Sequence, residues 1–125
     1  MAQNWSLNAV RVFVSDIENA KIFYCDLLGW VPKEDGRDKG FLLFEAGAVQ
    51  LVVEIVDVDA QQDWKLAGRF TGVSFEVDDV YALYESLVRK GVEFVRIPET
   101  KNWGGVVASF VDPDRNGITI FSAAK

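Results

Sequence analysis

The sequence predicts an α+β fold in which two tandem βαβββ modules form a curved, eight-stranded mixed sheet around a cavity. Three observations support this prediction: an internal repeat, alternating strands that end at helix-capping aspartates, and a length of 125 residues that suits one domain with one core. The chain is 50% hydrophobic and 26% charged, which is typical of a globular protein. We therefore expect a single domain over residues 1–125, with repeats at about 7–57 and 70–122.

The repeat becomes visible when residues 10–17 are aligned with residues 73–80. In both segments, VRVFVSDI and VSFEVDDV, residues of opposite faces alternate as in a strand, and the residue before the last is an aspartate that can cap a helix. A first helix is expected at about 17–28, before Gly29, and a second at about 80–90, before Gly91. Because each helix covers one face of its own sheet, the other face is left open and can line a cavity.

Three further strands are expected after each helix. They lie at about 30–35, 40–46 and 48–56 in the first half, and at about 92–97, 105–111 and 117–121 in the second. The last strand follows the segment DPDRNG, in which proline, aspartate and asparagine-glycine favour a tight turn.

Composition excludes several classes of function. The formal net charge of −6 at pH 7 disfavours nucleic-acid binding, because phosphate contacts need clustered lysine and arginine. The chain has no histidine, which removes Ser-His-Asp and Cys-His catalysis and the commonest ligand of transition metals. No apolar run is long enough for a membrane span. Cys25 is expected to be a half-buried apolar side chain, and the lack of a secretory signal favours the cytoplasm.

Three stretches carry a family resemblance. They are VFVSDIENAKIFYCDLLGW, GVSFEVDDVYALYESLVRKGVEF and FVDPDRNGITIF. In these stretches and in its order of elements, the chain resembles the vicinal oxygen chelate superfamily, which includes glyoxalase I, extradiol dioxygenases, fosfomycin-resistance enzymes and bleomycin-resistance proteins. The resemblance implies this fold, a ligand cavity and pairing of two chains into a homodimer.

The resemblance also implies where a divalent metal would bind, at four cavity-facing positions. In this sequence they fall on Ala9, on Gly72, on Thr119 and on Leu51 or Val52. A metal site needs three or four good ligands, which these side chains do not supply, although Gln50 and Glu54 lie near the last position. We therefore expect no metal and no other cofactor, as in bleomycin-resistance-like members.

Strand alternation predicts the rest of the cavity lining. If Ala9 and Gly72 face the cavity, residues two and four positions further along each strand face it too. In the loop ETKNWGGVV, Trp103 is expected to stack on a planar or cationic ligand. Trp5 and Trp64 are expected either to contact the ligand or to lie in a dimer interface. The candidate ligand-binding residues are Arg11, Phe13, Gln50, Glu54, Ser74, Glu76, Trp103, Thr119 and Phe121.

Three functions compete at this point. The first is a metal-free homodimer that binds or sequesters a small aromatic or cationic molecule without converting it, so that no residue is catalytic. The second is a metal-independent lyase or isomerase, with Glu76 or Glu54 as general base and Arg11 as electrophile. The third is an interaction module whose cavity is filled by its own side chains. The three charged residues could also form an ion-pair network that only orders the sheet.

Overall fold

The computed structural model describes residues 3–124 and contains two four-stranded sheets. The first has the order β1-β4-β3-β2 and the second the order β5-β8-β7-β6. In each sheet the first strand of the module is parallel to the last, and the other pairs are antiparallel. The strands are β1 (Ala9–Val14), β2 (Glu34–Gly36), β3 (Phe41–Ala46), β4 (Val49–Ile55), β5 (Phe70–Glu76), β6 (Glu93–Thr100), β7 (Val106–Val111) and β8 (Gly117–Ser122).

This arrangement confirms the predicted α+β fold of two βαβββ modules. The eight strands do not form one continuous hydrogen-bonded sheet, and an isolated bridge pairs Phe13 of β1 with Ala67 in the linker before β5. The strand predicted at 30–35 is also shorter than expected, because Gly29 to Lys33 have no regular structure and pairing with β3 starts at Glu34.

Both predicted helices are present, and their aspartate caps hold as expected. Asp16 accepts hydrogen bonds from the main-chain N–H groups of Glu18 and Asn19, and Asp79 accepts one from Ala82. The helices are α1 (Ile17–Lys21), continued by the π-helix η1 (Ile22–Leu27), and α3 (Val80–Arg89). Two short helices were not predicted from the sequence, the 3₁₀-helix η2 (Arg37–Lys39) and the linker helix α2 (Val58–Trp64), which is capped by Asp57.

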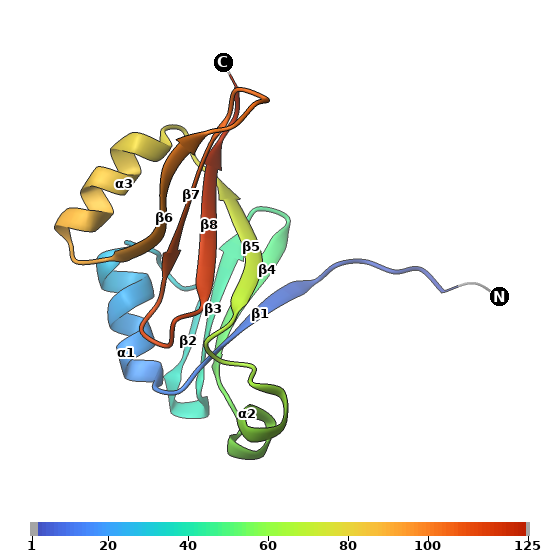
Figure 1. Cartoon of the computed structure of the whole chain (residues 1–125). Helices are drawn as coiled ribbons and strands as arrows, with labels where there is room; N and C mark the ends of the chain where they lie inside the picture. Colours follow the sequence, from blue (N-terminus) through green and yellow to red (C-terminus); the bar gives the residue numbers. More distant parts are fainter. Residues whose placement is uncertain (1–2, 125) are drawn as a thin grey trace.

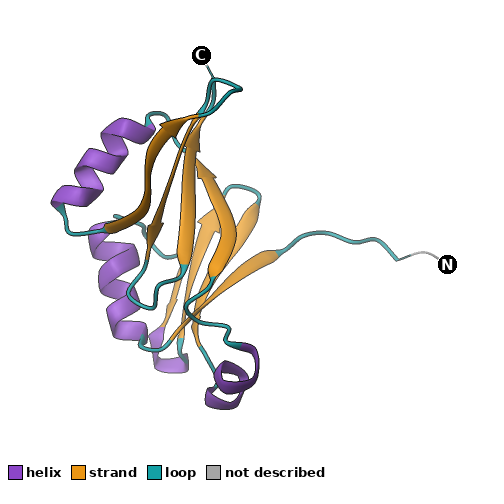
Figure 2. Ribbon diagram, viewed as in Figure 1, coloured by secondary structure: helices purple, strands orange, loops and turns teal. Residues whose placement is uncertain are grey.

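The helices α1 and α3 lie on the same side of the two sheets (Figure 1), and Figure 2 shows the opposite side free of them. Strand alternation follows from this layout. In β1, Val12 and Val14 are buried in the core beneath the helices, whereas Arg11 faces away from it and is exposed. The buried apolar residues of both modules form one core, which holds the modules together.

A buried polar cluster also connects the modules. The Asp112 carboxylate accepts hydrogen bonds from the Tyr24 hydroxyl at 2.7 Å and from the main-chain N–H of Asn116 at 2.8 Å. The Asn116 side chain donates to the main-chain oxygen of Phe13 at 2.8 Å and accepts from the Gly68 N–H at 2.8 Å. The turn predicted from DPDRNG therefore links β7 and β8 to β1, η1 and the linker.

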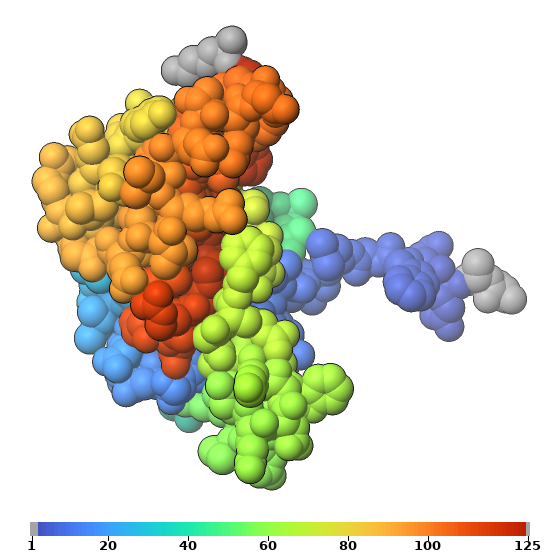
Figure 3. All heavy atoms as spheres, viewed as in Figure 1, coloured from blue at the N-terminus to red at the C-terminus, as the bar shows by residue number. Residues whose placement is uncertain are grey.

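Residues 3–8 form an extended N-terminal arm. The arm runs away from the rest of the chain on the side opposite α1 and α3 (Figures 1 and 3), and Trp5 is 95% exposed. Within residues 3–124, none of the helices has the length and apolar character needed to span a membrane.

Candidate functional site

A groove of about 520 Å³ lies between the two modules, and it contains three of the candidate ligand-binding residues. Gln50 enters it from β4, and Ser74 and Glu76 enter it from β5. β4 lies beside β1 in the first sheet, and Phe13 of β1 forms a bridge with Ala67 in the linker just before β5. The remaining lining is mostly apolar and consists of Leu7, Val10, Ala46, Gly47, Val49, Leu51, Gly72, Val73 and Phe75.

A cluster of aromatic rings lies next to this groove and reaches it through Phe75. The rings of Trp30 and Phe75 lie 5.1 Å apart between centroids, and Trp30 also packs against Phe44 at 5.5 Å. These three rings line a second cavity of about 360 Å³, which shares Ala46, Gly47, Leu51 and Phe75 with the groove. The two cavities together provide an apolar floor with an aromatic side.

Arg11, Phe13 and Glu54 form a separate cluster on the open face of the first sheet. The Arg11 guanidinium donates two hydrogen bonds to the Glu54 carboxylate, at 3.1 and 2.6 Å, and lies 4.9 Å from the centre of the Phe13 ring. The hydrogen bonds and charge of Glu54 raise the pKa of Arg11. Because the Arg11 side chain is 60% exposed, this pair is a surface ion pair rather than the buried network considered from the sequence.

Thr119 and Phe121 lie on the open face of β8, beside the groove strand β5. Thr119 pairs with Ser74 and Phe121 pairs with Glu76 across the parallel ladder. The Thr119 hydroxyl forms a 2.8 Å hydrogen bond with that of Ser109, and both side chains are buried. Thr119 therefore extends the polar row of β5 into the sheet. Its hydroxyl, however, is already hydrogen-bonded to Ser109 of the neighbouring strand β7.

Trp103 lies elsewhere, in the loop between β6 and β7. It is 52% exposed, and its ring covers Gly105, where an added Cβ would meet the ring at 1.7 Å. Trp103 is not among the residues that line the groove, so the predicted stacking role has no support within one copy of the chain.

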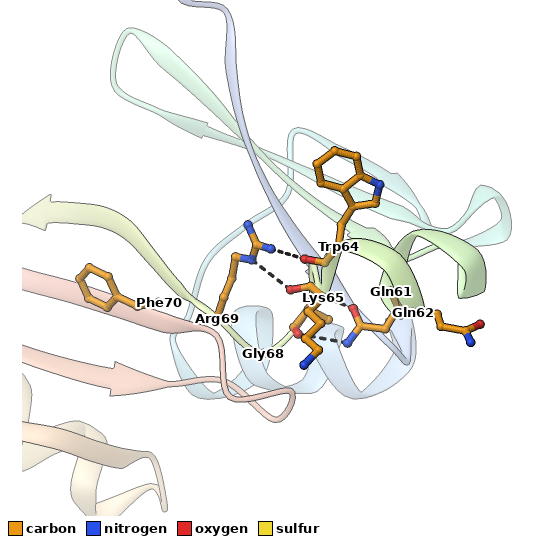
Figure 4. A pocket seen from close by; sticks show the side chains of 8 residues that line it. Gln61, Gln62, Trp64, Lys65, Gly68, Arg69 and Phe70 are labelled. Carbon is orange, nitrogen blue, oxygen red and sulfur yellow. Dashed lines mark hydrogen bonds between the residues drawn. The ribbon is translucent and has the colours of Figure 1, made fainter.

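Trp64 lines another hollow, of about 790 Å³, along the linker that joins the modules (Figure 4). Figure 4 shows the Arg69 guanidinium donating to the main-chain oxygens of Trp64 and Lys65, while Gln61 bonds the main chain of Ala67. These bonds fix the linker, and they leave the Trp64 ring 71% exposed.

Sequence reasoning missed Trp30 and the groove role of Phe75. Alternation along β5 correctly predicted that Phe75 packs toward the helices, where it contacts the core. The groove, however, opens at the junction of the two sheets, so it also reaches residues of the core-facing side. A period-two pattern describes the faces of one sheet and carries no information about such a junction.

The positions that the resemblance connects with metal ligands carry few donor atoms. Ala9 pairs with Gln50 across the ladder, and Gly72 lies where the pairing of β5 with β8 is irregular. Within residues 3–124, no three side chains of His, Cys, Asp or Glu type gather in a group that could hold a metal ion.

The chain is similar in sequence to two bacterial proteins. It is 30% identical over 119 residues to a probable lactoylglutathione lyase from Synechocystis, covering 90% of this chain and 91% of the relative. It is 29% identical over 120 residues to the uncharacterized protein YraH of Bacillus subtilis, covering 90% and 94%.

Solved structures show the same similarity. TnmS3, an antibiotic binding protein from Streptomyces sp. CB03234, superposes with a TM-score of 0.76 at 27% identity over 99% of this chain and 100% of that protein. UcmS2 superposes with a TM-score of 0.79 at 23% identity, over 95% of this chain and 98% of the other, and supports the fold alone. The family model of the Glyoxalase/Bleomycin resistance protein/Dioxygenase superfamily matches residues 6–120, and the chain belongs to this superfamily.

Proposed function

We propose that this chain binds a small aromatic or cationic molecule in the groove between its modules and does not convert it. The lining of the groove carries this proposal. Among the described residues that line it, Glu76 is the one charged side chain, Gln50 and Ser74 are neutral and polar, and most others are apolar. A volume of about 520 Å³ is in the usual range of ligand sites, about 300–1,000 Å³.

Charge and aromatic contacts favour the same class of ligand. A carboxylate on an apolar lining favours a cation, and the net charge of −6 attracts cations to the molecule as a whole. Phe75 and Trp30 offer ring faces on which a planar or cationic group can stack. The description of TnmS3 as an antibiotic binding protein, at 27% identity, also supports binding without conversion.

Binding is proposed to be independent of metal. Of the donors near the positions connected with metal ligands, the Thr119 hydroxyl is hydrogen-bonded to Ser109, and the Glu54 carboxylate is held by Arg11. Ala9 and Gly72 add no donor atoms. This donor set does not fit a divalent metal, which needs three or four ligands in one cluster. We further propose that the chain acts as a homodimer in the cytoplasm.

A second candidate function is a metal-independent lyase or isomerase that uses a groove carboxylate as general base. Glu76 suits this role better than Glu54, because Glu54 is paired with Arg11, whereas no ion pair of Glu76 is formed within residues 3–124. The Synechocystis relative, a probable lactoylglutathione lyase, is a further reason to test this function.

The test uses two fluorescent dyes of opposite charge, thioflavin T as the cationic aromatic probe and anilinonaphthalene sulfonate as the anionic one. We expect thioflavin T to bind more tightly, and Glu76→Gln to weaken it about 2- to 10-fold, since one ion pair contributes on the order of 1 kcal/mol. Glu85→Gln, which removes an exposed carboxylate from α3, is the matched control and is expected to leave binding unchanged.

Two results would contradict the selection of a cationic ligand by Glu76, and a third would contradict binding without conversion. Equal affinity of the two dyes, or an effect of Glu85→Gln as large as that of Glu76→Gln, would show that Glu76 does not select the ligand. Conversion of S-lactoylglutathione by the protein, abolished in Glu76→Gln, would establish the enzymatic alternative instead.

A further inference from the structure

A cavity of about 130 Å³ lies in the core, between the helices and the second sheet. Its apolar lining comes from the end of η1, from α3, and from β5, β7 and β8, and it includes Leu28, Val77, Leu83, Leu87, Phe110 and Ile120. We call it the core cavity. In another protein, an apolar cavity of about 150 Å³ stays dry and binds benzene or xenon. The core cavity therefore suits a compact apolar group of nearly that size.

Phe75 separates the core cavity from the groove. This residue lines both of them, and it also lines the second cavity of about 360 Å³, where its ring lies 5.1 Å from that of Trp30. Protein interiors are close-packed, so a ring in the core usually has no room to turn. Phe75, in contrast, is half-buried and borders three hollows. Its side chain can therefore move to another rotamer and open the core cavity to the groove.

We propose that the core cavity receives an apolar substituent of the ligand, and that this substituent enters from the groove by displacing the Phe75 ring. The inference rests on the proposed function, because the groove holds the rest of the ligand. Glu76, which is proposed to attract a cationic group, lines both the groove and the core cavity. A cation held by Glu76 is thus one residue away from Phe75. The ligand class narrows to a cationic aromatic molecule with a compact apolar substituent.

The volume of the core cavity limits the size of this substituent. Benzene has six carbon atoms and fits a cavity of about 150 Å³, so a cavity of about 130 Å³ holds about five. Burying one methylene group raises affinity up to about 4-fold. Affinity should therefore increase with the length of an alkyl substituent up to about five carbon atoms. A longer chain has no further apolar space in the core cavity, so the increase should stop there.

The first experiment uses N-alkylpyridinium ions, from methyl to octyl, that displace thioflavin T from the protein. We expect affinity to rise about 2- to 4-fold per methylene group up to pentyl and to level off at longer chains. Leu83→Phe, which fills the core cavity from α3, is expected to remove the dependence on chain length. Val88→Phe is the matched control, because it adds a ring to the same helix at a position that is 45% exposed and outside the cavity lining.

The second experiment tests the role of the Phe75 ring. In Phe75→Leu, a smaller side chain stands between the groove and the core cavity, so pentylpyridinium should associate faster in stopped-flow mixing. The affinity series should also level off one or two carbon atoms later than in the wild type. Phe94→Leu is the control, because Phe94 is a half-buried ring of the same sheet that lines neither the groove nor the core cavity. Urea unfolding establishes that each variant is folded.

Xenon tests the core cavity without a groove ligand. Under xenon pressure, we expect the methyl resonances of Leu87 to shift in the wild-type protein and those of Val88 to stay in place. In Leu83→Phe the shift of Leu87 should disappear, because the added ring occupies the space that xenon would take.

The outcomes separate this inference from the proposed function. Affinity that does not depend on chain length, that rises without a limit through octyl, or that is unchanged by Leu83→Phe would overturn the inference while leaving ligand binding in the groove in place. If the wild-type protein binds neither thioflavin T nor any pyridinium ion, the proposed function fails. Xenon then still decides whether the core cavity accepts an apolar group, and an unshifted Leu87 would overturn the inference as well.

Discussion

Replacing Tyr24 with phenylalanine would test how strongly one hydrogen bond holds the two modules together. The Tyr24 hydroxyl donates to Asp112 at 2.7 Å, from η1 in the first module to the turn after β7 in the second. The Tyr24 side chain is fully buried and packs against the rings of Phe23 and Trp30, which phenylalanine can still contact. The substitution therefore removes the hydrogen bond and little else.

The magnitude follows from the partners that Asp112 keeps. A hydrogen bond to a charged group contributes about 1.5–3 kcal/mol to the free energy of unfolding. In the variant, the Asp112 carboxylate still accepts from the N–H groups of Asp114 and Asn116 and from the Asn116 side chain. We therefore expect the lower end, about 1.5 kcal/mol near pH 7, or a decrease in melting temperature of roughly 5 °C.

The loss should depend on pH, because burial raises the pKa of Asp112 above its usual value of 3.8. Because the pKa is raised in the folded state, the contribution of Asp112 to stability is greatest below pH 3.8 and is lost as the pH rises through the folded pKa. The hydrogen bond from Tyr24 opposes this rise, so the pKa of Asp112 should be higher still in the variant. Tyr24→Phe should therefore cost less stability near pH 4 than near pH 7.

Urea unfolding at both pH values measures the effect. Tyr84→Phe is the control, because Tyr84 is a half-buried tyrosine of α3 that packs against Phe94, and no hydrogen bond of its hydroxyl is formed within residues 3–124. It should change stability by less than about 0.5 kcal/mol. If Tyr24→Phe unfolds like the wild type, or loses equal stability at both pH values, Asp112 does not depend on this bond.

Three further predictions concern other parts of the structure. Arg11→Met should change the free energy of unfolding by less than about 1 kcal/mol in urea unfolding, because its ion pair with Glu54 is 60% exposed on the arginine side; a larger loss would indicate a structural network. Gly105→Ala should displace the Trp103 ring, which lies 1.7 Å from the added Cβ, and increase quenching of tryptophan emission by acrylamide; unchanged quenching would show that the ring is elsewhere. Cys25 should react with a thiol reagent at pH 8 more slowly than free cysteine, because burial raises the pKa of its thiol and lowers the thiolate fraction; equal rates would contradict this.

The fold could be predicted because its signals are local and occur twice. The Asp16 and Asp79 caps, the alternation of β1 and β5, and the turn before β8 each depend on a few neighbouring residues. The linker helix α2 was missed because its residues, VDAQQDW, carry no repeating apolar face, and the structure buries none of them.

The candidate site could be predicted only in part, because it depends on contacts between modules. Alternation predicted that Arg11 and Glu76 both face the cavity, yet Glu76 lines the groove while Arg11 pairs with Glu54 outside it. Which of two open-face residues meets the other module depends on the angle between the sheets. That angle is determined by distant contacts, such as those of Tyr24 and Asn116, which have no local sequence pattern.

The π-helix η1 has a consequence for how the two halves of this chain can differ in length. Gly29 follows the cap Asp16 by 13 residues, whereas Gly91 follows Asp79 by 12. The N–H of Leu28 bonds the main-chain oxygen of Phe23, five residues back, which takes up one extra residue inside the helix. An insertion of one residue in a duplicated unit is thereby absorbed as a wider helical turn. The strand before the helix and the glycine after it keep their places, and the symmetry between the halves survives unequal length.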